Sequence, residues 1–212
     1  MRILTLILCL LLLLVFHVMV IARIVRRFIK VPCPHQFVRL IENPVRRVLF
    51  GPEKVLNRAG ILPGMRILEL GPGGGFLTVE VANIVGEQGI VCCIDIQPEM
   101  IKTLRKKAKK LGLEERILEV VGDASYLPYP DRSFDIAYMV AVLGEIPEQR
   151  RAIREIWRML KNGGTLSITE ILPDPDYSLP RTVRRLCEGM GFKHVSTRGN
   201  LFCYTSNFIK GD

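Results

Sequence analysis

The chain has 212 residues, a length that suits one domain with a substantial hydrophobic core. Its 30 Lys and Arg outnumber its 21 Asp and Glu, but the first 60 residues hold 10 of the cations and only 2 of the anions. The remainder is nearly neutral and lacks the basic excess that nucleic-acid binding by a folded domain requires. Nucleic acid is therefore not expected as a partner.

Residues 3–22 form a long apolar run without a charged side chain. As a helix this run is about 30 Å long, roughly the thickness of the hydrocarbon part of a bilayer. A cleaved signal peptide is the alternative, but its apolar region typically has about 7–15 residues. The cations that follow, Arg23, Arg26, Arg27 and Lys30, favour the cytoplasmic side. Residues 1–30 are thus predicted to be a single-pass transmembrane anchor with a basic flank, placing the protein at a membrane and its main domain in the cytoplasm.

Residues 31–60 are predicted to form short helices interrupted by prolines. Apolar residues recur at helical spacing with arginines between them, which is typical of an amphipathic segment at a membrane surface. Cations beside a membrane anchor are attracted to anionic lipid headgroups by about 1 kcal/mol each. The sequence therefore predicts a basic helical collar, or lid, between the bilayer and the domain of residues 61–212.

From residue 61 onward, apolar strand patterns alternate with helical patterns. Strands that are apolar throughout and joined by helices indicate a mostly parallel sheet covered on both faces. The predicted fold is thus α/β, a Rossmann-like doubly wound sheet. Strands are expected at 65–70, 89–96, 117–123, 133–140 and 164–170, helices at 75–85, 97–113, 147–160 and 179–191, and a final antiparallel pair of strands at 194–199 and 201–209.

The six cysteines include no CxxC pair and do not cluster with the three histidines. Cys92 and Cys93 lie inside a predicted buried strand. Reduced structural thiols are the expected state, and no metal site is predicted.

A glycine-rich loop, Gly71-Pro-Gly-Gly-Gly75, joins the first predicted strand to the first helix of the domain. The dinucleotide fingerprint GxGxxG fits only in part, because Phe76 occupies the third glycine position. The loop also lacks the lysine of a phosphate-binding P-loop. Two acids accompany it: Glu69 at the end of the first strand and Asp95 at the end of the second, where a carboxylate can bind both hydroxyls of a ribose. A nicotinamide dinucleotide remains an alternative ligand.

Four motifs in order, ILELGPGGG, CCIDIQPEMI, VVGDASYLPYPDRSFDIAYMV and MLKNGGTLSITE, resemble those of class I S-adenosylmethionine-dependent methyltransferases. The resemblance covers residues 61–212 and is nearest to the ubiquinone/menaquinone C-methyltransferase type (methyltransferase type 11). It implies a seven-stranded sheet with an antiparallel last strand, and S-adenosylmethionine as the cofactor.

The resemblance also implies roles for individual residues. The backbone of Gly71, Gly73 and Gly75 would approach the methionine part of the cofactor, with Glu69 near its amino group. Asp95 would bind the ribose hydroxyls.

Three further positions would surround the adenine: Ile96 against the ring, Asp123 at its amino group and the Ala124 backbone beside it. Val140 and Ala141, just past the fourth strand, would lie near the sulfonium.

Glu145 is the one acid outside these motifs that is a candidate catalytic residue. It follows the fourth strand, where related enzymes place residues that face the substrate. It could act as a general base or pair with a cationic acceptor. A structural role at the start of the next helix is the alternative.

The sequence predicts a membrane-anchored methyltransferase whose acceptor is lipidic or a small hydrophobic molecule, such as a phospholipid headgroup, a quinone precursor, a thiol or a phenol. Two alternatives stay open. One is a tethered methyltransferase acting on a soluble, protein or nucleic-acid substrate. The other is a non-catalytic membrane protein that binds the cofactor.

Overall fold

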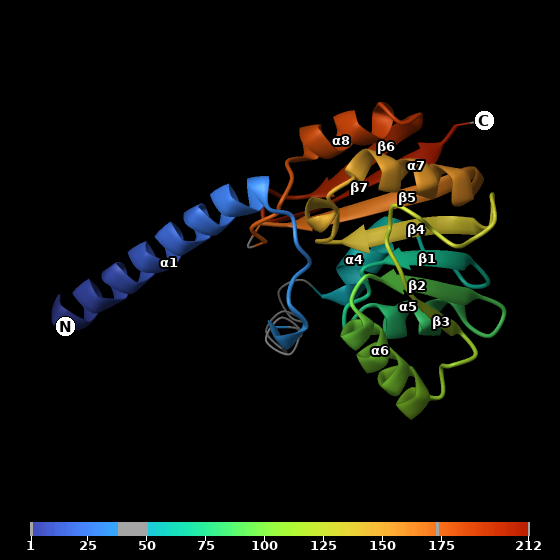
Figure 1. The fold of residues 1–212 in the computed structure, drawn as a ribbon, viewed down its shortest axis with the longest axis horizontal. Coiled ribbons are helices and arrows are strands. Elements are labelled where there is room, and N and C mark those ends of the chain that lie inside the picture. The colour runs from blue at the N-terminus through green and yellow to red at the C-terminus, as the bar shows by residue number, and fades with distance from the viewer. Residues whose placement is uncertain (1, 38–50, 173, 212) are drawn as a thin grey trace.

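The computed structural model describes residues 2–37, 51–172 and 174–211, apart from the side chains at 2, 3, 8, 12, 15, 16 and 27. Its centre is one seven-stranded sheet (Figure 1). The strands are β1 (Arg66–Leu70), β2 (Ile90–Asp95), β3 (Ile117–Val121), β4 (Phe134–Val140), β5 (Leu160–Ile171), β6 (Phe192–Gly199) and β7 (Cys203–Lys210).

The strand order is β3-β2-β1-β4-β5-β7-β6. The pairs β1–β2, β1–β4, β2–β3 and β4–β5 are parallel, whereas β7 is antiparallel to both β5 and β6. The order reverses direction at β1, so the carboxyl ends of β1, β2 and β4 meet at one edge, the usual place for a ligand in a doubly wound sheet. The predicted α/β architecture with an antiparallel last strand is confirmed.

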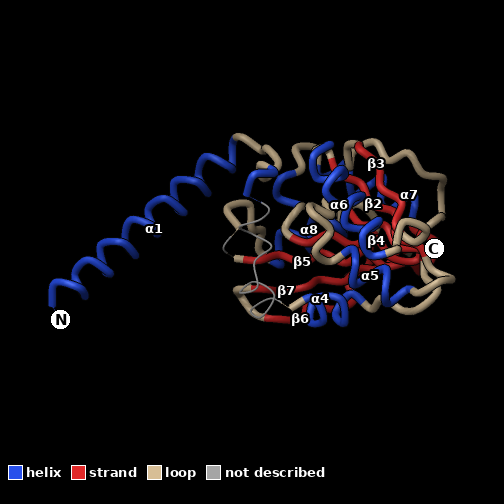
Figure 2. The backbone as a smooth tube through the Cα atoms, turned by 90° about the horizontal axis from the view of Figure 1, so that it is seen from below, coloured by secondary structure: helices blue, strands red, loops and turns tan. Residues whose placement is uncertain are grey.

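Helices cover both faces of the sheet, and each face has its own apolar core (Figure 2). One core includes side chains of α4 (Pro52–Ala59), α5 (Thr78–Val85) and α6 (Pro98–Leu111). The other includes side chains of α7 (Gln149–Met159) and α8 (Pro180–Glu188). Alternate residues of the central strands point into alternate cores. This explains why these strands are apolar along their whole length.

Two predicted elements start at clearly different residues in the structure. The helix after the glycine loop begins at Thr78 rather than at residue 75, because the chain is still turning through the loop. The strand predicted at 164–170 begins earlier, because the preceding helix ends at Met159 and β5 starts immediately at Leu160. Gly163 and Gly164 lie in an irregularity of β5, where its pairing with β4 jumps from Leu160 to Thr165.

The N-terminal helix α1 (Arg2–Phe28) projects from the body of the domain (Figures 1 and 2). It continues past residue 22 through Arg23 and Arg26, so the apolar run and the cations predicted to flank it belong to one helix. Over the residues that the structure describes, no helix has both the length and the apolar character to cross a membrane. The predicted transmembrane span is therefore not supported.

Only parts of the predicted collar belong to the described residues. They contain a short 3-10 helix, η1 (His35–Phe37), and α4, which ends at Gly60. The predicted amphipathic helices between residues 38 and 50 lie outside the described residues.

Candidate cofactor site and its N-terminal cover

The glycine loop between β1 and α5 has a backbone that requires glycine. Gly71, Gly73 and Gly75 have φ values of 67°, 55° and 80°, in the left-handed region that side chains disfavour. The Gly71 N–H donates to the Ile94 carbonyl of the neighbouring strand at 2.9 Å, which anchors the start of the loop at the end of β2. The three predicted glycines therefore form one tight bend at the carboxyl edge of the sheet.

Asp95 connects this bend to the end of β2. Its carboxylate accepts hydrogen bonds from the Gly73 N–H at 3.3 Å and from the Gln97 N–H at 2.9 Å. Burial raises the pKa of Asp95, and these two backbone donors oppose the shift. The structure thus brings Asp95 and the glycine loop together. Cofactor binding by these residues stays a prediction.

Glu69 is 3% exposed and is aligned with Cys93 and Tyr138 of the strands on either side. The Cys93 thiol donates to its carboxylate at 3.5 Å. Burial raises the pKa of Glu69 to about 7, while the nearby hydroxyls of Thr78 and Tyr138 lower it. The side chain is buried on one face of the sheet, among residues of the neighbouring strands. Its predicted role at the cofactor's amino group is untested.

The residues predicted to surround the adenine lie at two adjacent strand ends. Ile96, directly after β2, is 53% exposed, which is unusual for isoleucine and leaves an apolar surface at the carboxyl edge of the sheet. Asp123, after β3, is exposed and accepts from the Ser125 N–H at 2.7 Å, which is typical of a turn. Ala124 packs partly against the core. The Gly122 N–H donates to the Asp95 carbonyl at 2.9 Å and holds these two strand ends together.

The end of β4 reaches the same edge with a strained residue. Val140 is half-buried, and Ala141 has φ = 54°, a conformation that is rare without glycine. The Ala141 N–H donates to the Thr169 carbonyl at 2.8 Å, which holds the residue in place. A strained backbone conformation persists only where the surrounding structure holds it, and such residues are concentrated at functional sites. The position of Ala141 beside the glycine loop fits that pattern.

Glu145 lies in the 3-10 helix η2 (Leu143–Glu145) that follows β4. It accepts a hydrogen bond from the Cys33 N–H at 3.2 Å and lies 3.7 Å from the Arg26 guanidinium. Burial raises the pKa of Glu145 to about 8, although the Cys33 N–H and Arg26 oppose the shift. Its described partners thus come from the N-terminal segment, which sequence reasoning did not connect with this acid.

Glu170, at the end of β5, is a second acid that sequence reasoning missed. It is buried, and its carboxylate accepts from the Ser178 N–H at 2.9 Å. Burial raises its pKa to about 8, and the neighbouring acids Asp174 and Asp176 raise it further. An acid at the end of an apolar strand pattern was the only signal in the sequence.

The residues at this edge fit S-adenosylmethionine. The glycine bend lets the backbone come close to a ligand because no side chains block it, Asp95 supplies a carboxylate that can accept from ribose hydroxyls, and Ile96 offers an apolar surface to an adenine ring. When bound, the cofactor supplies an electrophilic methyl group, and the protein orients the acceptor and excludes water. Over the described residues, no group of three His, Cys, Asp or Glu could hold a metal ion.

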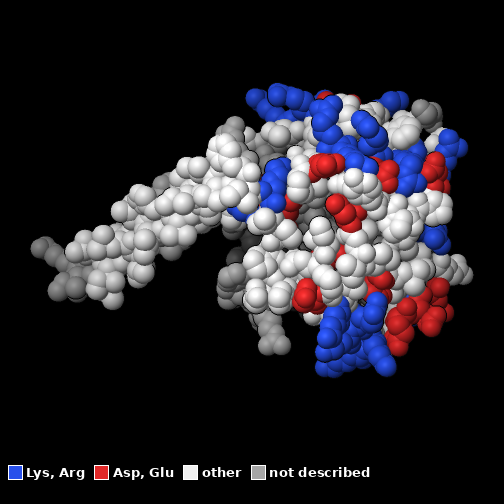
Figure 3. Space-filling model, viewed as in Figure 1, with Lys and Arg blue, Asp and Glu red and all other residues white. Residues whose placement is uncertain are grey.

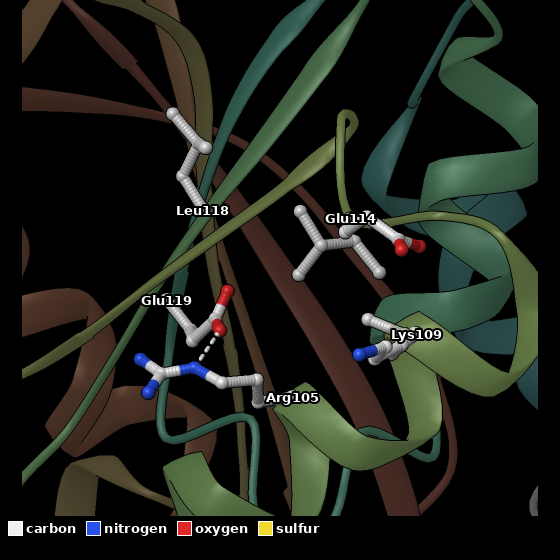
Figure 4. A pocket seen from close by; sticks show the side chains of 7 residues that line it. Arg105, Lys109, Glu114, Leu118 and Glu119 are labelled. Carbon is white, nitrogen blue, oxygen red and sulfur yellow. Dashed lines mark hydrogen bonds and ion pairs between the residues drawn. The ribbon is translucent and has the colours of Figure 1, made fainter.

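A pocket of about 410 Å³ lies elsewhere, between α6 and β3 (Figure 4). Arg105 and Glu119 form an ion pair in it, and Leu118 comes from the edge strand. The residues that line this pocket include neither the glycine loop nor Asp95. It is therefore separate from the candidate site.

Comparisons with known proteins agree with this geometry. Residues 68–168 match the family described as "Methyltransferase domain". The ubiquinone/menaquinone biosynthesis C-methyltransferase UbiE of Shewanella sediminis is 34% identical over 148 residues, which cover 69% of this chain and 57% of that protein. UbiE of Shewanella piezotolerans is 37% identical over 128 residues, covering 60% and 51%. The chain thus spans little more than half the length of these relatives.

Solved structures show the same fold. An S-adenosylmethionine-dependent methyltransferase from Aquifex aeolicus has a TM-score of 0.78 at 26% identity, covering 84% of this chain and 99% of that one. The [4+2]-cyclase SpnF has a TM-score of 0.68 at 21% identity, covering 76% and 79%. The fold alone therefore does not fix the reaction.

The sheet order, the glycine bend and the acid at the end of β2 define a Rossmann-like cofactor-binding domain. With the sequence match over residues 68–168, the chain contains a methyltransferase domain similar to those that use S-adenosylmethionine, and S-adenosylmethionine is its implied cofactor.

Proposed function

We propose that the protein transfers a methyl group to a lipidic or small hydrophobic acceptor at the cytoplasmic surface of a membrane. The UbiE relatives are named for quinone biosynthesis, which supports a hydrophobic acceptor without identifying it. Methyl transfer itself is supported by the match to the methyltransferase domain.

The observation that carries the proposal is the apolar surface of α1. Most of this helix shows no charged atoms in Figure 3, and Lys and Arg appear where it meets the domain. Exposed apolar surface of this extent marks an interaction site rather than ordinary protein surface. Its exposed large apolar side chains have exposed fractions between 38% and 80%: Leu4, Leu6, Ile7, Leu10, Leu11, Leu13, Leu14, Val18, Met19, Val20, Ile21, Ile24, Val25 and Phe28.

The β6–β7 hairpin adds apolar surface beside the end of α1. Leu201 and Phe202, at its tip, are 60% and 61% exposed. The Phe202 carbonyl accepts from the Leu172 N–H at 2.8 Å, and the Leu172 carbonyl accepts from the Arg23 side chain of α1 at 3.0 Å. The hairpin tip and the end of α1 are therefore joined through one loop, and both can contact the same lipid surface.

For an acceptor that must lose a proton, the protonation state of Glu145 determines whether this residue can serve as the base. With a pKa of about 8, its carboxyl group is mostly protonated at neutral pH and becomes a proton acceptor only as the pH rises toward and above that value. An acceptor that must lose a proton is then expected to react faster in mildly alkaline solution.

The test compares the full chain with a variant lacking residues 2–20. This deletion removes most of the apolar helix but keeps Arg23, Arg26 and Lys30, which contact the domain. Both proteins are incubated with radiolabelled S-adenosylmethionine and vesicles of total membrane lipid, and cofactor affinity is measured by calorimetry. We expect equal cofactor affinity and at least tenfold less label in the lipid fraction for the variant, because loss of tethering lowers the effective concentration of acceptor. Equal labelling by both proteins would refute membrane attachment through α1.

A further inference from the structure

Residues 29–37, here called the strap, connect α1 to the remainder of the chain and contact the candidate site from two sides. The N–H of Cys33 donates to Glu145, after β4, and the Cys33 carbonyl accepts from the Gln97 side chain, after β2. β1 and its glycine loop lie between these two strands in the sheet. Both backbone polar groups of one residue are thus held from opposite sides of the cofactor loop.

We propose that the strap is a closing element of the cofactor crevice, and that Gln97 and Glu145 are positioning residues that couple strap closure to cofactor binding. The inference rests on the use of S-adenosylmethionine by this chain, but not on membrane attachment or on the identity of the acceptor.

Gln97 provides the connection on the cofactor side. Its backbone N–H donates to Asp95 at 2.9 Å, and its side chain Nε2 donates to the Cys33 carbonyl at 2.9 Å. Gln97 therefore links Asp95, the carboxylate predicted to bind the ribose, to the strap through two hydrogen bonds. An occupied ribose site fixes Asp95, which fixes the Gln97 backbone and so favours the rotamer that reaches Cys33.

Glu145 provides the connection on the β4 side. Its turn packs tightly on the loop after β5, since a Cβ on Gly144 would lie 2.2 Å from the Asp176 carbonyl oxygen. Asp176 in turn pairs with Arg26 of α1, whose guanidinium also lies 3.7 Å from Glu145. The Lys30 ammonium donates to the Ile146 carbonyl at 3.4 Å. The strap is thus held on this side by cations both in α1 and at its own start.

The start of the strap and the part around Cys33 are held to the domain by different kinds of contact. Arg26 and Lys30 fix its start to the domain, whereas the Cys33 backbone forms hydrogen bonds with Glu145 and Gln97. Each of these two bonds contributes a net of only about 1 kcal/mol, and the proposal is that the Cys33 part opens while the start remains attached. An acceptor is expected to enter where the strap lifts from Gln97 or Glu145, and bound cofactor is expected to keep the strap closed.

The experiment uses Cys33 as its own reporter. The full-length protein is treated with iodoacetamide, with and without saturating S-adenosylhomocysteine, and alkylation of each cysteine is quantified by peptide mass spectrometry. Cys33 and Cys203 are both half-buried, but only Cys33 lies on the strap. We expect the cofactor product to slow Cys33 alkylation about fivefold, the weight of one net hydrogen bond, and to leave the Cys203 rate unchanged.

Matched variants distinguish the specific effect of Gln97 and Glu145 on Cys33 protection from a general loss of stability. Gln97→Ala should abolish the protection of Cys33, whereas Gln88→Ala, at an exposed glutamine before β2, should preserve it. Glu145→Ala should also abolish protection. Glu145→Gln keeps a carbonyl oxygen to accept the Cys33 N–H and should restore it. In methyl-transfer assays, Glu145→Gln would then raise the KM for S-adenosylmethionine less than Glu145→Ala does. A large loss of kcat in Glu145→Gln would instead make Glu145 a base.

Two outcomes would overturn the proposal. One is an alkylation rate of Cys33 that is the same with and without S-adenosylhomocysteine, when calorimetry shows that the ligand binds. The other is protection that persists in both Gln97→Ala and Glu145→Ala. Absence of ligand binding by calorimetry would instead refute cofactor use. Failure of lipid methylation with intact Cys33 protection would refute only the proposed acceptor.

Discussion

Gly71 and Val142 are in contact across the cofactor edge of the sheet: a Cβ on Gly71 would lie 2.5 Å from Cγ2 of Val142. The two residues come from the ends of β1 and β4. Gly71 also has φ = 67°. The glycine is therefore required both by its backbone conformation and by the space that Val142 occupies.

Gly71→Ala should destabilise the protein and weaken cofactor binding. Left-handed backbone costs a non-glycine residue about 1–2 kcal/mol, and overpacking against Val142 adds roughly 1–3 kcal/mol. Gly60→Ala is the control, because Gly60 has φ = 76° but no atom within 4 Å of the added Cβ. Urea denaturation and calorimetry with S-adenosylmethionine should show a loss of affinity only in Gly71→Ala. Equal losses of stability in the two variants would contradict the packing argument.

Asp95→Ala should lower cofactor affinity roughly ten- to hundredfold, since hydrogen bonds to a charged group contribute about 1.5–3 kcal/mol. The same variant releases the Gly73 and Gln97 N–H groups that Asp95 holds. Asp135→Asn is the control. Asp135 binds the Arg66 N–H and Lys161 near the start of β4, so its loss should lower stability without changing the dissociation constant. An unchanged dissociation constant in Asp95→Ala, measured by calorimetry, would exclude the predicted ribose contact.

The stability of the protein should fall as the pH rises from about 5 to 8. Glu170 has a pKa raised to about 8 by burial, so the folded state holds its proton where the unfolded chain has released it. The stability that this proton contributes is complete below the ordinary glutamate pKa and is lost as the pH rises through the folded value. In Glu170→Gln the free energy of unfolding should vary less steeply in this window, by up to about 1.4 kcal/mol per pH unit. Denaturation in urea at a series of pH values measures the difference, and an equal slope would show that Glu170 is ionised in the folded protein.

The β6–β7 hairpin tip should enter the lipid surface. Phe202→Trp places a fluorophore at the tip, and Val195→Trp places one at another exposed position of the same hairpin. With vesicles of phosphatidylcholine and phosphatidylglycerol carrying brominated acyl chains, the Phe202→Trp emission should shift to the blue and be quenched. The emission of Val195→Trp, which shares the Trp157 background, should change little. Quenching of equal strength in both variants would argue against a specific contact of the tip.

The strands and helices of the domain could be predicted from the sequence because each has a strong local signal. Continuous apolar runs such as 89–96 and the helical pattern of 97–113 appear in the structure as β2 and α6, shortened at their ends. The cofactor edge could be predicted for a related reason: glycines and acids at strand ends must meet when the strands are parallel. Asp95 and Gly73 do meet, at hydrogen-bonding distance.

The N-terminal side of the site could not be predicted in the same way. Arg26 and Asp176 are separated by 150 residues, and nothing in the local pattern of either residue indicates that they pair. Gln97 was interpreted only as the start of a helix, although its side chain binds the strap. Such contacts depend on where the chain returns in three dimensions, which periodicity does not encode. The same reason explains why Glu145 was considered a base or a helix start and not a strap contact.

The shortness of the connection from α1 to Cys33 has a consequence for how the enzyme would meet its acceptor. Four residues lie between Phe28, the last residue of α1, and Cys33, and the five Cα–Cα steps from one to the other reach about 17 Å when fully extended. If α1 lies in lipid, the catalytic opening cannot move farther than this from the headgroups. The search for an acceptor then becomes two-dimensional diffusion in a leaflet, and turnover should depend on the mole fraction of acceptor in the membrane rather than on its concentration in bulk water.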